Sequence, residues 1–174
     1  MNLIASVQVD HTKIVPGIYE SRVDEIGGDC ATTFDIRMKT PNKEPAIHPN
    51  AMHTIEHVVA TFLRNDAEWK DRIVYWGPMG CLTGFYLILK GDREPREIFD
   101  LVLRAFQSVQ DAEDVPGSSP ENCGNCLMHN LGMAKWHARR FADYLAENAD
   151  NPGIFEYPRA ERLVTGDGRQ FFDS

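Results

Sequence analysis

Two histidines stand four residues apart in the run His53-Thr54-Ile55-Glu56-His57. On a helix, positions i and i+4 lie on the same face one turn apart, so both imidazoles can bind one metal ion. Glu56 borders that face and is close enough to move a proton on a ligand of the ion. Open catalytic metal sites use three protein ligands and leave one position free. The run therefore predicts two of three ligands together with a proton carrier.

The third ligand must come from elsewhere in the chain, and Cys123 is the best source. It stands beside Gly124 in a loop that leads into a helix, from which a thiolate can reach a metal. A His/His/Cys set suits zinc, iron(II) or cobalt(II). Cys126 offers an alternative, a closed structural zinc site that uses both cysteines and both histidines and has no catalytic position.

Cys81 stands among glycines in the stretch from Gly77 to Phe85, where the backbone can approach a ligand closely. A cysteine near a metal and a glutamate can serve as a general acid or base. A buried structural cysteine in a strand is equally consistent with the local sequence.

Two other functions fit parts of this pattern. His-x-x-Glu-His is also the inverted zincin motif of some metallopeptidases, which draw a third ligand from a glutamate on a second helix. Cys123 is better placed than any glutamate for that role here. A non-catalytic module stabilised by zinc would instead use four protein ligands and unfold without metal.

The elements that must position these residues follow from hydrophobic periodicity. Helical spacing predicts helices over residues 51–65, 94–111 and 127–148, and alternation predicts strands over 4–10 and 32–38. Two more strands are predicted over 73–76 and 82–90. The order of elements lacks a βαβ rhythm and indicates an α+β fold, an antiparallel sheet with helices packed on one face. We expect one catalytic domain over residues 1–150 and a loosely ordered tail over 151–174. His129 and His137 are expected to have structural roles.

Length and charge narrow the class of protein. A chain of 174 residues suits one domain, and a formal net charge of −8 argues against binding to nucleic acid or to an anionic membrane. No apolar run is long enough to span a membrane, and the first residues lack a secretory signal. Four irregularly spaced cysteines do not form a disulfide scaffold, so we expect a reducing, cytoplasmic location.

Taken together, these motifs resemble the S-ribosylhomocysteine lyase family, often called LuxS, over nearly all of the chain to about residue 147. The resemblance rests on six blocks in the family's order and spacing: Ser6 to His11, Phe34 to Arg37, Pro41 to Lys43, His53 to His57, Pro78 to Gly84, and Cys123-Gly124.

The resemblance implies a role for each motif. His53, His57 and Cys123 would bind one divalent metal per subunit, iron(II) in the native state with zinc or cobalt able to substitute. Glu56 and Cys81 would be the catalytic acid/base pair. The substrate S-ribosylhomocysteine would be held by Ser6, His11 and Arg37. The family forms homodimers whose active sites use residues of both subunits.

The family reaction is consistent with this chemistry. The metal polarises a carbonyl, which migrates from C1 to C3 of the sugar, and β-elimination then releases homocysteine and 4,5-dihydroxy-2,3-pentanedione, the autoinducer-2 precursor. Among the positions that depart from the family pattern, Tyr75 replaces an aspartate expected in the substrate pocket, and Gly77 replaces a serine.

Overall fold

A computed structural model describes residues 9–158 together with the two-residue strands 163–164 and 170–171. Four antiparallel strands form its main sheet in the order β1-β2-β4-β3. Their bounds are β1 Gly17–Ile26, β2 Asp29–Arg37, β3 Ile73–Pro78 and β4 Gly84–Lys90. The short strands β5 Leu163–Val164 and β6 Gln170–Phe171 pair with each other.

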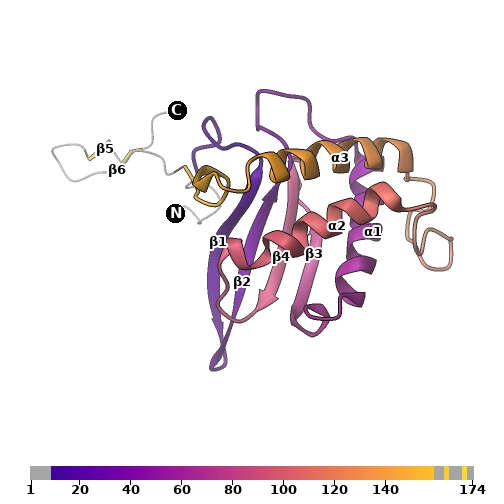
Figure 1. Ribbon diagram of the computed structural model, residues 1–174, viewed down its shortest axis with the longest axis horizontal. Coiled ribbons are helices and arrows are strands. Elements are labelled where there is room, and N and C mark those ends of the chain that lie inside the picture. The colour runs from indigo at the N-terminus through magenta and orange to yellow at the C-terminus, as the bar shows by residue number, and fades with distance from the viewer. Residues whose placement is uncertain (1–8, 159–162, 165–169, 172–174) are drawn as a thin grey trace.

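Three α-helices accompany this sheet: α1 Pro49–Asn65, α2 Phe99–Asp111 and α3 Leu131–Glu147. Short 3-10 helices occur at η2 Lys70–Arg72, η3 Pro95–Ile98 and η4 Pro152–Ile154. The helices pack against one another and lie along one side of the sheet (Figure 1). Sequence periodicity predicted this α+β architecture, and the structure confirms it. No helix in the described part is both long and apolar enough to cross a bilayer.

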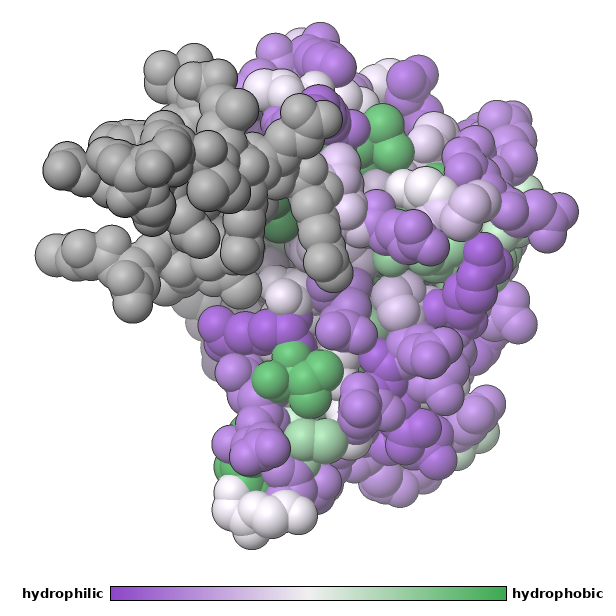
Figure 2. Space-filling model, turned by 90° about the vertical axis from the view of Figure 1, so that its left-hand side faces the viewer, coloured by the Kyte–Doolittle hydropathy of each residue, from purple (hydrophilic) through white to green (hydrophobic). Residues whose placement is uncertain are grey.

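The core lies between this sheet and the helices. Phe34 and Ile36 on β2 are fully buried in the same cluster as Ile55 of α1 and Phe106 of α2. Alternate residues of β2, including Asp35 and Arg37, point to the opposite side because side chains alternate across a strand. Both charged side chains are nevertheless buried. Polar side chains cover most of the described surface shown in Figure 2.

Helix α1 begins earlier than its sequence pattern predicts. His48 is the N-cap of this helix: its backbone is extended and its ring nitrogen accepts from the Asn50 N–H at 3.2 Å. Pro49 follows at the first helical position, where a missing N–H costs nothing. Helix α3 begins at Leu131, later than expected, because the side chain of Asn130 caps it by accepting from the Met133 N–H at 2.9 Å.

The segment after helix α3 packs on the domain as far as the first residues of the expected tail. Ile154 is fully buried and Phe155 nearly so, and both belong to the main core cluster. Tyr157 stacks on Tyr19 of strand β1 with a ring-centroid separation of 4.8 Å. The packed part of the chain therefore runs past residue 150, where sequence composition predicted the domain to end.

Buried His137 on helix α3 makes the stability of this fold sensitive to acid. Its Nδ1 has no hydrogen-bond partner among the described residues, and burial, with nearby Lys39 and Arg140, lowers its pKa to about 4. The imidazole is neutral in the folded state but takes up a proton near pH 6.5 once unfolded, so its contribution to stability is lost as the pH falls from 6.5 towards 4.

We expect the free energy of unfolding to drop by roughly 2 kcal/mol more in the wild type than in His137→Leu between pH 7 and 4.5. Urea denaturation at a series of pH values measures this difference. Parallel curves for the two proteins would show that His137 does not carry the acid sensitivity.

Candidate metal centre and acid–base site

His53 and His57 lie one turn apart on helix α1, and backbone carbonyls fix both rings. The Nδ1 atom of His53 lies 3.0 Å from the Met128 carbonyl oxygen, and that of His57 lies 2.8 Å from the Pro116 carbonyl oxygen. A carbonyl oxygen can only accept, so each Nδ1 must carry the hydrogen. Each Nε2 is then left with a free lone pair, as a metal-binding imidazole requires.

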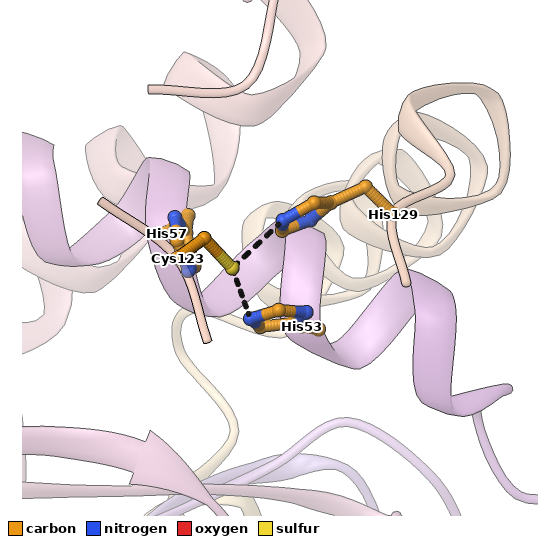
Figure 3. Close-up of side chains that lie close together, drawn as sticks. All are labelled: His53, His57, Cys123 and His129. Carbon is orange, nitrogen blue, oxygen red and sulfur yellow. Dashed lines mark hydrogen bonds between the residues drawn. The ribbon is translucent and has the colours of Figure 1, made fainter. Parts of the chain in front are cut away.

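Cys123 brings the third donor atom to this cluster from the loop between helices α2 and α3. Its buried Sγ lies 3.5 Å from Nε2 of His53 and 3.6 Å from Nε2 of His129 (Figure 3). Two ligands of one tetrahedral zinc ion, one sulfur and one nitrogen, are separated by about 3.5 Å. All donor atoms of the four residues in Figure 3 lie within 4.8 Å of one another. The cluster therefore fits a small divalent ion.

His129 joins the cluster although sequence analysis expected it to have a structural role. It lies just before helix α3, and its Nδ1 is 3.3 Å from the hydroxyl of Thr54. That hydroxyl donates to the Asn50 carbonyl, so its oxygen accepts from His129 and leaves Nε2 of His129 free as a donor atom. Burial, with the neighbouring His53 and His57, lowers the pKa of His129 and favours its neutral form. The six-residue spacing between Cys123 and His129, within one loop, is the sequence signal that could have indicated this proximity.

Two other predicted residues lie outside the cluster. Glu56 is half-buried on helix α1 between the two histidine positions, and its carboxylate accepts no hydrogen bond from the described residues. Cys126 is half-buried in the loop and is not one of the four clustered residues. The cluster thus differs from the closed zinc site with two cysteines that sequence analysis kept as an alternative.

Cys81 is exposed in a tight turn between strands β3 and β4. The turn is closed by hydrogen bonds from the Leu82 N–H to the Met79 carbonyl and from the Met79 N–H to the Gly84 carbonyl, both 2.9 Å. Leu82 has a φ of 58°, a left-handed conformation that is uncommon for a residue with a side chain. Its carbonyl accepts from the Ile47 N–H, which ties the turn to the segment before helix α1.

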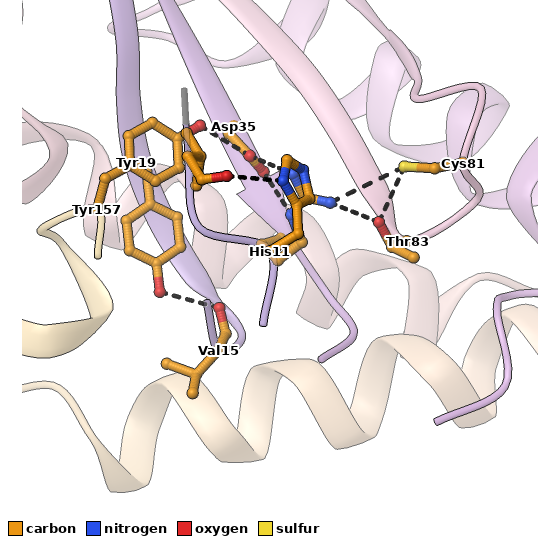
Figure 4. A network of polar contacts seen from close by, with 9 residues as sticks. His11, Val15, Tyr19, Asp35, Cys81, Thr83 and Tyr157 are labelled. Atoms are coloured by element: carbon orange, nitrogen blue, oxygen red, sulfur yellow. Dashed lines mark hydrogen bonds and ion pairs between the residues drawn. The ribbon is translucent and has the colours of Figure 1, made fainter. Parts of the chain in front are cut away.

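Arg37 lies beside Cys81 in a second group of polar side chains, most of which are labelled in Figure 4. The Nη1 atom of Arg37 lies 3.9 Å from Cys81 Sγ, and Cys81 Sγ lies 3.0 Å from the Thr83 hydroxyl. His11 lies beside this group and interacts electrostatically with Asp35. Ser6 lies outside the described residues. No hydrogen bond between described residues joins this group to Glu56 or to the metal cluster.

Tyr75 and Gly77, which both differ from the residues expected for the family, lie close together in the structure. A Cβ atom at residue 77 would lie 2.0 Å from the hydroxyl oxygen of Tyr75, which is far inside contact distance. Because Tyr75 is about half exposed, its ring can swing into solvent when residue 77 gains a side chain. The two positions therefore form one unit, in which the absence of a side chain at residue 77 makes room for the tyrosine.

The fold and the cluster define an α+β protein with a group of three histidines and a cysteine that could hold a metal ion. The profile of S-ribosylhomocysteinase (LuxS) matches residues 4–152, and the chain belongs to this family. It is 50% identical over 162 residues to an S-ribosylhomocysteine lyase of Phocaeicola vulgatus, covering 92% of this chain and 100% of the relative. An S-ribosylhomocysteine lyase of Porphyromonas gingivalis strain W83 is 53% identical over 159 residues, 91% of this chain and 99% of the relative. One from Borreliella burgdorferi strain ZS7 is 49% identical over 146 residues, 83% and 93% of the respective chains.

Proposed function

We propose that this chain cleaves S-ribosylhomocysteine to homocysteine and 4,5-dihydroxy-2,3-pentanedione, the autoinducer-2 precursor. The observation that supports this most strongly is the set of metal-binding donor atoms from His53, His57 and Cys123, in a chain whose family relatives are named S-ribosylhomocysteine lyases. Neither a metallopeptidase nor a non-catalytic zinc module gains support from these comparisons.

The metal in this proposal is one divalent ion per subunit, iron(II) in the native protein with zinc or cobalt as substitutes. Three unprotonated donors, two imidazole Nε2 atoms and one thiolate, suit these ions better than magnesium or calcium, which prefer oxygen ligands. When bound, such an ion supplies Lewis-acid polarisation of a sugar carbonyl and so acidifies the neighbouring C–H bond.

The protein's own groups then move the protons. Glu56 and Cys81 act as the acid/base pair: one removes a proton from a carbon next to the carbonyl, and the other delivers a proton as the carbonyl migrates from C1 to C3. In the final step the proton leaves C4 and the C5–S bond breaks, which releases homocysteine. Ser6, His11 and Arg37 hold the substrate.

We further propose that the chain acts as a cytoplasmic homodimer with active sites shared between subunits. Large apolar side chains remain exposed at Tyr75 on strand β3 and at Trp136 on helix α3. A second copy of the chain offers a partner that would cover such side chains. Sedimentation at micromolar concentration tests this assembly, and a monomer under conditions of full activity would contradict it.

The decisive experiment uses protein purified anaerobically and loaded with iron(II). Incubated with S-ribosylhomocysteine, it should release free thiol that Ellman's reagent detects, with one thiol for each pentanedione molecule formed. Peptidase activity on a peptide library without thiol release would favour the metallopeptidase instead.

The proposal assigns three ligands and leaves His129 as a neighbour, so that one position stays free for substrate. We expect His129→Ala to bind cobalt(II) with one ion per subunit and with affinity lowered by no more than about tenfold, the size of a supporting contact. Isothermal titration with cobalt(II) measures this. If the cobalt(II) affinity instead falls by much more than tenfold, as it does when a ligand is removed, His129 is a fourth ligand and the site is closed.

A further inference from the structure

Asp35 is a buried carboxylate on strand β2 that the proposed reaction does not use. The residue is only about 2% exposed. The Nε atom of Arg37 donates to its Oδ1 at 3.1 Å, and Nη2 of Arg37 donates to its Oδ2. The hydroxyl of Tyr157 donates to the same Oδ2 at 2.8 Å. A carboxylate buried this deeply depends on such donors to remain charged.

The guanidinium of Arg37 reaches from Asp35 to the Cys81 thiol. Two of its nitrogens face Asp35, while Nη1 donates to the Thr83 hydroxyl at 2.6 Å and lies 3.9 Å from Cys81 Sγ. Because a guanidinium is a rigid planar fork, the orientation of Asp35 determines where Nη1 lies. A change at Asp35 is thus transmitted to Cys81 through one side chain.

Tyr157 is itself held firmly in place. Its ring stacks on Tyr19 with an interplanar angle of 9°, and Ile154 just before it is fully buried. The hydroxyl of Tyr19 points elsewhere and donates to the carbonyls of Val15, at 2.9 Å, and Gly153, at 3.3 Å. Burial and the charge of Asp35 raise the pKa of Tyr157, so that its hydroxyl keeps its proton and remains a donor.

We propose that Tyr157 is a positioning residue for proton transfer at Cys81: its hydroxyl orients Asp35, and Asp35 holds the Arg37 guanidinium beside the Cys81 thiol (Figure 4). This inference rests on the acid/base role proposed for Cys81. It adds a residue from the segment that sequence analysis assigned to a loosely ordered tail. Tyr157 does not touch the reacting atoms and acts only through Asp35 and Arg37.

The arrangement predicts a dependence on pH. Burial raises the pKa of Asp35, and this is opposed by the charge of Arg37, by hydrogen bonds from Arg37 and Tyr157, and by His11. Among the described residues, Tyr19 and Tyr86 also interact electrostatically with this carboxyl. Loss of the Tyr157 hydroxyl removes one of the contacts that favour the charged form, so Asp35 binds a proton at a higher pH. A protonated Asp35 holds Arg37 less firmly, and the defect grows as the pH falls.

The test compares Tyr157→Phe with Tyr19→Phe in the metal-loaded enzyme. Each variant keeps the stacked rings and loses one hydroxyl, but of these two hydroxyls only that of Tyr157 donates a hydrogen bond to Asp35. We expect Tyr157→Phe to lower kcat/KM for S-ribosylhomocysteine by about fivefold at pH 7.5 and about tenfold at pH 6, as for a hydrogen bond to a charged group. Tyr19→Phe should change it by less than about twofold at both pH values. Equal losses in the two variants would mean that Tyr157 only anchors the C-terminal segment.

Two further measurements separate this inference from the proposed reaction. Alkylation of Cys81 by iodoacetamide at pH 7, followed by peptide mass spectrometry, needs no substrate and should slow about threefold in Tyr157→Phe but not in Tyr19→Phe. In an Asp35→Asn background, Tyr157→Phe should have no further effect on alkylation. The inference is overturned if Tyr157→Phe alone leaves the alkylation rate unchanged. It is also overturned if Tyr157→Phe slows alkylation just as much in the Asp35→Asn background. A wild-type enzyme that releases no thiol overturns the proposed reaction alone.

Discussion

Replacing Glu56 by glutamine is expected to lower kcat by about 10³-fold while the protein keeps its metal, because a general acid or base contributes roughly 10²–10⁴ in rate. Glutamine has nearly the shape of glutamate but cannot take up and release a proton. Glu56 is not among the four clustered donors, so its charge is not needed to hold the ion. Thiol release from S-ribosylhomocysteine measures kcat, and plasma mass spectrometry measures the metal.

The matched control is Glu147→Gln, the same change at an exposed position on helix α3. It should leave both the rate and the metal content unchanged. Full activity in Glu56→Gln would show that Glu56 does not transfer protons in the reaction. Loss of metal in that variant would instead make it a ligand, which would contradict its assignment as a proton carrier.

Cys123→Ala should lose the bound metal, with affinity lowered by more than about 100-fold, which exceeds the usual effect of a supporting contact. Its sulfur is the only thiolate in the described cluster, and soft thiolate donors contribute strongly to the binding of zinc and iron(II). Cys126→Ala removes a thiol three residues away and should bind metal as the wild type does. Competition with a chromogenic chelator measures both affinities. If Cys126→Ala loses the ion while Cys123→Ala retains it, the assignment of the third ligand is wrong.

Much of the metal centre could be predicted from sequence because its geometry is local. The spacing of His53 and His57 places both rings on one helical face, and the flanking apolar residues identify that helix. Cys123 could be proposed from its chemistry and its loop. His129 was expected to have a structural role instead, because its position in the cluster depends on how the loop between helices α2 and α3 folds back onto helix α1.

The polar group around Cys81 was only partly predictable from sequence, since the residues that build it are distant along the chain. Arg37 and Cys81 are 44 residues apart, and Tyr157 and Asp35 are 122 apart. No periodicity indicates such contacts. The stretch around Tyr157 contains glycine, proline and charge, which suggested a loose tail, yet its few apolar side chains dock on strand β1. Strand β1 itself was not predicted, because most of its residues after Tyr19 are polar or exposed.

The orientation of His53 and His57 comes from the carbonyl groups of Met128 and Pro116, and a carbonyl is present whatever residue stands there. Substitution at positions 116 and 128 can therefore leave the metal centre working, provided that the loop keeps its course. Cutting the main chain within that loop should disrupt the metal centre. A nicked protein keeps every side chain, but the carbonyl groups that orient the two imidazoles are no longer fixed in place. Limited proteolysis is thus a sharper probe of this centre than a scan of side chains in the loop.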